Sequence, residues 1–289
     1  MSWFKRKNIS ESPPPPGWAP APEPSRIHGL FHEATEDEYE QAEAFIAKHP
    51  VEPPKFLPSH VVEQIATNGC KVWNIINPPT SRFSGSIQDR DKGGIKIATS
   101  ASCKDVCLMS DLPIMAGLYD IKGKFGVYYE VTIDRMDGII AIGTACRPYP
   151  SWRLPGWNRL SAGLHLDDFH KFFEDPCGGR EYIQDLKISS KDTIGCGYVF
   201  STGTIFFTYN GTRLPPAFTG VYLPRTTHDV YAAIGVEGIN EFSVNFGNDV
   251  FKWAEGNEWS WKVEGHVGCL SGSSERDDEG LPAYSARLT

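Results

Sequence analysis

Apolar and polar residues alternate along many short segments in the middle of the chain, and turn-forming residues separate these segments. Alternation with a period of two is typical of β-strands that bury one face of a sheet. The predicted strands are residues 71–76, 95–99, 106–110, 126–134, 138–145, 160–166, 171–173, 193–200, 204–209, 230–236 and 241–246. Because no helical pattern lies between them, we expect an all-β sandwich. The dipeptide Asn210-Gly211 favours a type I′ hairpin turn, which needs a positive φ angle at both positions.

Two short helices are predicted before the strands. Thr35 can cap the first helix, the acidic residues 36–38 suit its N-terminus, and Pro50 ends it. Ser59 is expected to cap the second helix and Gly69 to end it. We expect both helices to pack on the β domain as an N-terminal extension.

Composition divides the chain into four segments. Residues 1–30 are rich in proline and are expected to be disordered, extended chain, because they hold too few apolar residues for a core. Residues 31–70 hold the predicted helices, and residues 71–262 hold the predicted β-sandwich domain. Residues 263–289 are rich in glycine, serine and charged residues, which predicts a disordered tail.

Charge and cysteine content exclude some classes of protein. A net charge of -8 argues against nucleic-acid binding, which needs a clustered basic surface. The chain has 7 scattered cysteines, an odd number that indicates reduced thiols rather than a disulfide framework. No stretch is apolar enough to predict a transmembrane segment or a secretory signal. We therefore expect a soluble, cytoplasmic protein.

Three patterns that suggest catalysis fail on distance or on missing partners. Glu130 and Asp134 share a strand face, but four residues place their carboxylates roughly 13 Å apart, too far for either glycosidase mechanism. His165 lies beside acidic residues, yet no serine or cysteine follows the pattern of a nucleophile elbow. Gly195-Cys-Gly197 lacks the lysine and third glycine of a nucleotide-binding loop. We expect no catalytic residue, no cofactor and no metal ion.

The segment 147–158 holds more large rings and guanidinium groups than a simple connection needs. Loops on a rigid sandwich commonly carry binding residues, and Arg, Tyr and Trp dominate interface energetics. We expect Arg147, Tyr149 and Trp152 to be exposed, whereas Trp157 fits either an exposed position or a core position beneath the loop. The candidate partner-binding residues are Arg147, Tyr149, Trp152, Arg153, Trp157, Asn158 and Tyr119.

Several motifs follow one another along the chain as they do in a known family. They are Val127-Tyr-Tyr-Glu-Val131, Ile142-Gly-Thr144, Lys171-Phe-Phe173, Asp192-Thr-Ile-Gly-Cys-Gly-Tyr198, Thr204-Ile-Phe-Phe-Thr-Tyr-Asn-Gly211, Val230-Tyr-Ala-Ala-Ile-Gly235 and Val244-Asn-Phe-Gly247. In order and spacing, across residues 117–251, these motifs resemble the signature of the SPRY domain. The resemblance implies a bent sandwich of two antiparallel sheets, no catalysis, and recognition of a protein partner by loops at one end.

The loop at 147–157 most resembles that of fungal SPRY proteins that act as adaptors for a WW-domain, HECT-type ubiquitin ligase on endosomes and vacuoles. Such adaptors carry a Pro-x-Tyr motif, which Leu281, Pro282 and Tyr284 provide in variant form. Many also carry a membrane span, which the sequence does not predict here. The resemblance implies a cytoplasmic location, peripheral to endosomal or vacuolar membranes.

A carbohydrate-binding, lectin-like sandwich is the alternative, because aromatic and polar loop residues also stack on sugar faces. A cytoplasmic location counts against this alternative. A purely structural subunit of a larger complex is a third possibility, for which the sequence offers no positive sign.

Overall fold

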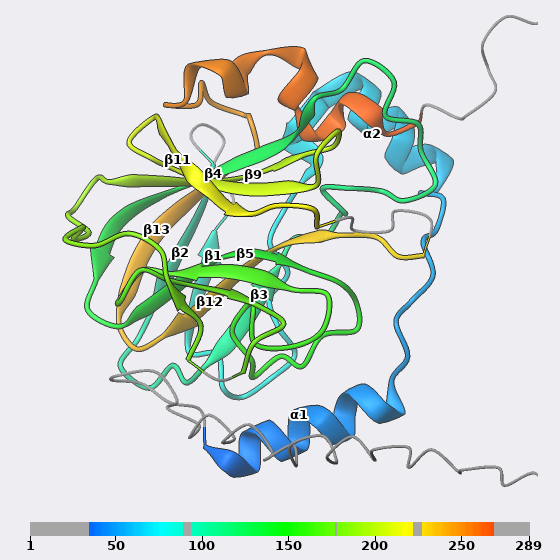
Figure 1. Ribbon diagram of the computed structural model, residues 1–289. Helices are drawn as coiled ribbons and strands as arrows, with labels where there is room; N and C mark the ends of the chain where they lie inside the picture. Colours follow the sequence, from blue (N-terminus) through cyan, green and yellow to red (C-terminus); the bar gives the residue numbers. More distant parts are fainter. Residues whose placement is uncertain (1–34, 89–93, 177, 222–226, 269–289) are drawn as a thin grey trace, which may run out of the picture.

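The computed structural model describes residues 35–88, 94–176, 178–221 and 227–268 (Figure 1). Within these residues, two antiparallel sheets pack face to face, as the sequence predicts, and only short helices accompany them. The seven-stranded sheet contains, in order, β1 (Gly85–Gln88), β2 (Ile95–Thr99), β13 (Asn240–Asn245), β4 (Gly126–Met136), β9 (Thr193–Val199), β10 (Thr204–Tyr209) and β11 (Thr212–Phe218). The six-stranded sheet contains β3 (Val106–Met109), β12 (Tyr231–Glu237), β5 (Ile139–Ala145), β6 (Ala162–His165), β7 (His170–Phe173) and β8 (Arg180–Glu181).

The main core lies between the two sheets. On the seven-stranded side, Val131 of β4 is in register with Val244 of β13, and both are buried. On the six-stranded side, Ile142 of β5 is in register with Ile234 of β12, and both are buried as well. All four belong to one apolar cluster. The alternation along the strands therefore sends one set of side chains inward and leaves the other set on the outer faces.

A smaller aromatic core covers the outer face of the seven-stranded sheet. Its members are Tyr128, Phe206, Phe251, Trp253 and Trp261, the last three from the segment that carries the 3-10 helices η2 (Ala254–Asn257) and η3 (Trp259–Trp261). The buried carboxylate of Glu130 anchors this segment by accepting the backbone N–H groups of Lys252 and Trp253, each at 3.0 Å. The Glu130 carboxylate thus has a structural role in this fold.

Most predicted strands are confirmed to within two residues at their ends. The strand predicted at 71–76 is wrong, because Gly69–Val72 form the 3-10 helix η1 and the ring of Trp73 fills a core position. The sequence pattern missed β1, which is mostly exposed, the two-residue β8, and β11. Pro215 and Pro216 argue against a strand in the sequence pattern of β11, but a strand at the edge of a sheet tolerates prolines. Asn210 and Gly211 have φ angles of 49° and 83°, which confirms the positive φ at both turn positions.

Both predicted helices form, as α1 (Glu36–Lys48) and α2 (Ser59–Asn68). Thr35 caps α1 as expected, with its hydroxyl accepting the N–H of Glu38 at 3.3 Å. The prediction for Ser59 is wrong, because Ser59 is the first helical residue and no side chain caps α2. Residues 49–58, called the strap below, run along the sandwich from α1 to α2, and α1 lies at the lower side of Figure 1, far from α2.

The described structure continues past the predicted start of the tail. The 3-10 helix η4 (Val263–His266) buries both Val263 and His266 against the domain. The predicted boundary at residue 263 is therefore too early. The predicted Pro-rich segment 1–30 and the motif residues Leu281, Pro282 and Tyr284 lie outside the described residues.

Candidate partner-binding surface

The loop between β5 and β6, residues 146–161, folds back over the outer face of the six-stranded sheet. Leu154 and Trp157 pack there with Ile139, Ala141 and Phe172 in a small apolar cluster. Gly235 of β12 permits this close approach, since a Cβ atom on it would lie 2.7 Å from Leu154 Cδ2. The loop is therefore a packed layer of the sandwich.

Tyr149 is buried within this layer, so the expectation that it is exposed is wrong. Its side chain is 8% exposed and packs on Cys107 of β3, Ala145 of β5 and Ala233 of β12. Its hydroxyl donates a hydrogen bond to the carbonyl of Leu154 at 2.7 Å. Burial raises the pKa of this hydroxyl. Small residues at the three strand positions leave room for the ring, a signal that the sequence contains.

Arg153, Trp157 and Asn158 form an internal brace of the loop. Arg153 is 2% exposed, its guanidinium lies 4.5 Å from the centre of the Trp157 ring, and its Nε donates to Asn158 Oδ1 at 2.9 Å. Burial lowers the pKa of Arg153. Trp157 thus takes the core position that the sequence left open. These three candidates support the surface from below.

His165 belongs to the same support. Its ring lies between Trp157 and Phe172, and its Nε2 lies 3.1 Å from the carbonyl oxygen of Pro155. Burial lowers the pKa of His165 to about 4, which keeps the imidazole neutral. The neutral ring can donate to Pro155 and hold the loop against β6.

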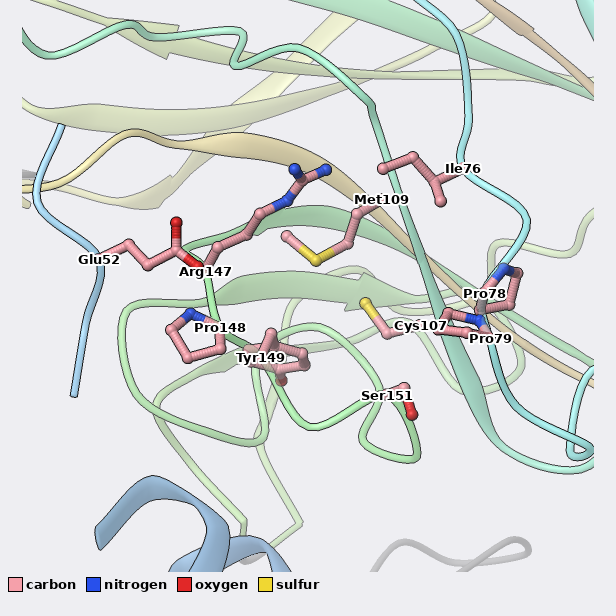
Figure 2. A pocket seen from close by; sticks show the side chains of 10 residues that line it. All are labelled: Glu52, Ile76, Pro78, Pro79, Cys107, Met109, Arg147, Pro148, Tyr149 and Ser151. Atoms are coloured by element: carbon pink, nitrogen blue, oxygen red, sulfur yellow. The ribbon is translucent and has the colours of Figure 1, made fainter. Parts of the chain in front are cut away.

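Arg147 stands at the edge of the loop and is half-buried. Its guanidinium stacks 3.9 Å from the centre of the Tyr231 ring and donates to the carbonyl of Ser110 at 2.5 Å. A groove of about 280 Å³ opens on one side of it (Figure 2). Arg147, Pro148 and Tyr149 form one wall, Ile76, Pro78 and Pro79 form the other, and Cys107 and Met109 lie between them.

A second hollow of about 350 Å³ opens on the other side of Arg147, with Glu52 and Arg147 lining both. Asp229 lines this second hollow and accepts the backbone N–H groups of Gly117 at 2.6 Å and Lys55 at 3.2 Å. Burial raises the pKa of Asp229. The two hollows make one surface that is apolar at the Met109 end and charged near Arg147.

The N-terminal extension covers much of the remaining predicted site. Tyr119 is buried, and its hydroxyl accepts the N–H of Leu57 in the strap at 3.0 Å. Trp152 is half-buried, and its ring meets Phe45 of α1 edge to face at 5.7 Å. The expected exposure of Trp152 is therefore only partly met. Arg159, which no sequence pattern singled out, donates to the carbonyl of Ile46 in α1 at 3.1 Å.

Residues 126–249 match the model of the SPRY domain family. Residues 126–249 form an SPRY domain. The motif-based resemblance and the predicted sandwich are both confirmed. The SPRY region supplies Arg147, Pro148 and Tyr149 to the groove, whereas Ile76, Met109 and the other wall residues precede it in the chain.

Proteins named ssh4 are among the curated relatives of the chain. The protein from Sclerotinia sclerotiorum is 30% identical over 243 residues, which cover 81% of this chain and 42% of that protein. An SPRY domain-containing protein of Schizosaccharomyces pombe is 27% identical over 210 residues, covering 72% of this chain and 49% of that protein. The chain thus spans less than half the length of either relative.

Solved SPRY structures are also similar to the chain. A human SPRY domain crystal structure shows 24% identity and a TM-score of 0.41, covering 55% of this chain and 94% of that one. The SPRY domain of human HERC1 shows 14% identity and a TM-score of 0.39, covering 55% of this chain and 91% of that one.

In the described part of the chain, no group of three or more His, Cys, Asp or Glu side chains is placed to hold a metal ion. The cysteines Cys70, Cys103, Cys107, Cys146 and Cys196 are free and buried, as the sequence predicts. No helix among the described residues has the length and apolar character needed to cross a membrane.

Proposed function

We propose that this chain is a non-enzymatic adaptor that captures a target protein on its SPRY domain and recruits a WW-domain, HECT-type ubiquitin ligase through its tail. The observation that carries the first half is the groove beside Arg147. An SPRY domain is a protein-interaction module, and this groove is its open surface next to the loop that the sequence singles out.

The groove suits an extended peptide with an apolar side chain. Met109 gives its floor a flexible, polarizable surface, and Pro78 and Pro79 give it a wall with little conformational freedom to lose. The loop wall is rigid because Tyr149 is anchored beneath it. Preorganised walls reduce the entropy lost on binding, which favours specific capture.

The second half rests on Leu281, Pro282 and Tyr284, which lie outside the described residues. A Leu-Pro pair in extended conformation packs on an aromatic groove of a WW domain, and a tyrosine fills the neighbouring pocket. Through such a ligase the adaptor serves ubiquitin-dependent trafficking or degradation. The protein then works in the cytoplasm and reaches endosomal or vacuolar membranes through its partners.

The ligase half is tested with isolated WW domains and the full chain. Wild type is compared with Tyr284→Ala, and Ser285→Ala serves as the matched control in the same segment. We expect Tyr284→Ala to lose WW binding while Ser285→Ala keeps it. Equal binding by all three proteins would remove the ligase from the proposal.

The target half is tested by proximity labelling in cells with two substitutions of exposed apolar residues. Ile76 is 39% exposed in the groove wall, and Val250 is 84% exposed outside the groove lining. We expect Ile76→Asp to lose labelled proteins that wild type and Val250→Asp both retain. Identical labelled sets for all three proteins would show that the groove captures nothing.

A further inference from the structure

We propose that the surface beneath α1, formed by Arg82, Trp152 and Arg159 and called the seat below, is a helix-binding site. An acidic amphipathic helix of the captured protein binds this seat in place of α1. The identity of this partner class rests on the proposed capture function. The site itself is defined by the contacts of α1, which covers part of the predicted partner-binding surface with a segment of the same chain.

The domain binds backbone carbonyls at both ends of α1. Near the start of the helix, Trp152 Nε1 donates to the carbonyl of Glu38 at 3.2 Å. At the other end, Arg159 donates to the carbonyls of Ile46, in the last turn, and of His49, the C-cap residue. The last carbonyls of any helix lack partners within the helix, and a cation there also meets the negative end of its dipole. Arg159 is therefore suited to cap a helix of any sequence.

Side-chain contacts define which helices fit. The Glu38 carboxylate pairs with Arg82 at 2.7 Å, Ala42 is buried, and Phe45 packs on Trp152. These three positions follow the spacing i, i+4, i+7 and so share one face of the helix. The seat thus selects an acidic residue, a small residue four positions later and an aromatic residue three positions after that.

The contacts of α1 leave it displaceable. Ala42 is the residue of α1 that is buried, whereas Phe45 and Ile46 are half-buried. A single 13-residue helix is marginal in water without tertiary support. A partner helix with the same three-residue face, joined to further contacts in the groove beside Arg147, would outcompete α1. Release of α1 would free Trp152 and Arg159 for that helix.

The test uses the full chain and a fluorescent peptide of residues 35–49, with binding followed by anisotropy. In wild type, α1 competes with the peptide. In the variant Glu38→Gln with Phe45→Ala, docking of α1 is weakened, and peptide affinity should rise about tenfold, in proportion to the freed fraction. Glu40→Gln, an exposed position on α1, should behave like wild type.

Two further arms test the seat and the partner chemistry. Adding Arg159→Ala to the weakened variant should abolish the gain. A model helix of Ala, Glu and Lys that carries Glu, Ala and Phe at the three face positions should bind, and its Phe→Ala version should not. No binding to a weakened variant that melts like wild type would overturn the proposal, as would equal binding by both model helices.

Hydrogen exchange of wild type keeps the test decisive if the weakened variant misfolds. Saturating peptide should raise exchange at the α1 amides, and unchanged exchange would overturn the proposal. The peptide assays need neither target nor ligase. The helix-binding site therefore stands or falls separately from the WW-domain and proximity-labelling tests of the proposed function.

Discussion

Replacing Tyr149 tests whether the loop is a packed layer of the sandwich. The ring fills the space between the loop and the small residues Cys107, Ala145 and Ala233 on the outer face of three strands. Its hydroxyl also satisfies the carbonyl of Leu154. Tyr149→Ala removes the ring and the hydroxyl together, whereas Tyr149→Phe removes only the hydroxyl, which bonds to the Leu154 carbonyl and to the Ser161 hydroxyl.

The two substitutions differ in expected cost. A large-to-small change of a buried aromatic side chain lowers the free energy of unfolding by about 3–5 kcal/mol. After Tyr149→Phe the Leu154 carbonyl still accepts the N–H of Trp157 at 3.2 Å, so each lost hydroxyl hydrogen bond costs about 0.5–1.5 kcal/mol. We therefore expect Tyr149→Ala to be the more destabilising change, with Tyr149→Phe between it and wild type.

Urea denaturation at constant pH, followed by circular dichroism, measures both free energies of unfolding. Val250→Ala is the control, because Val250 is 84% exposed and its substitution should stay within about 0.5 kcal/mol of wild type. A value for Tyr149→Ala as close to wild type as this control would refute the packed-layer interpretation.

Three other predictions concern the rest of the fold. Glu130→Ala should cost about 2–3 kcal/mol, because the N–H groups of Lys252 and Trp253 lose their acceptor; unchanged urea unfolding would contradict this. Burial, with Glu237 and Glu38 nearby, raises the pKa of Asp105 from 3.8 to about 7, so the folded state binds more protons than the unfolded state in that window. The free energy of unfolding should therefore fall as pH rises from about 4 to 7, and Asp105→Asn should weaken this pH dependence. Equal pH dependence in wild type and Asp105→Asn would argue against the raised pKa of Asp105. Gly211→Ala should lower the melting temperature, since its φ is 83° and a Cβ would lie 2.5 Å from the Lys252 carbonyl oxygen; an unchanged melt would count against the I′ turn.

Local patterns were enough to predict most of the fold. Alternation places β2 at residues 95–99 as predicted, and the Asn210-Gly211 dipeptide predicts its own turn. The pattern failed where tertiary context overrides it. Trp73 reads as a strand residue but fills the core after a 3-10 turn, and the prolines of β11 are tolerated because that strand lies at a sheet edge.

The candidate site was predictable in location but not in exposure. The concentration of rings and guanidinium groups marks a loop that lines the groove, yet the burial of these side chains depends on residues far away in the chain. Tyr149 is buried because Cys107 and Ala233 are small, and Trp152 is half-buried because α1 packs against it. Such pairings join segments that are distant in the chain, 114 residues apart for Trp152 and Glu38, and so lie beyond the reach of any local pattern.

The central claim is that one chain joins a target to a ubiquitin ligase through two separate sites. The most direct measurement is ubiquitination of a target identified by proximity labelling, in a reaction reconstituted with the WW-domain ligase and the full chain. Wild type should support modification of the target, whereas Ile76→Asp should lose target capture and Tyr284→Ala should lose the ligase, each abolishing the product. Undiminished ubiquitination with both variants would contradict the adaptor function.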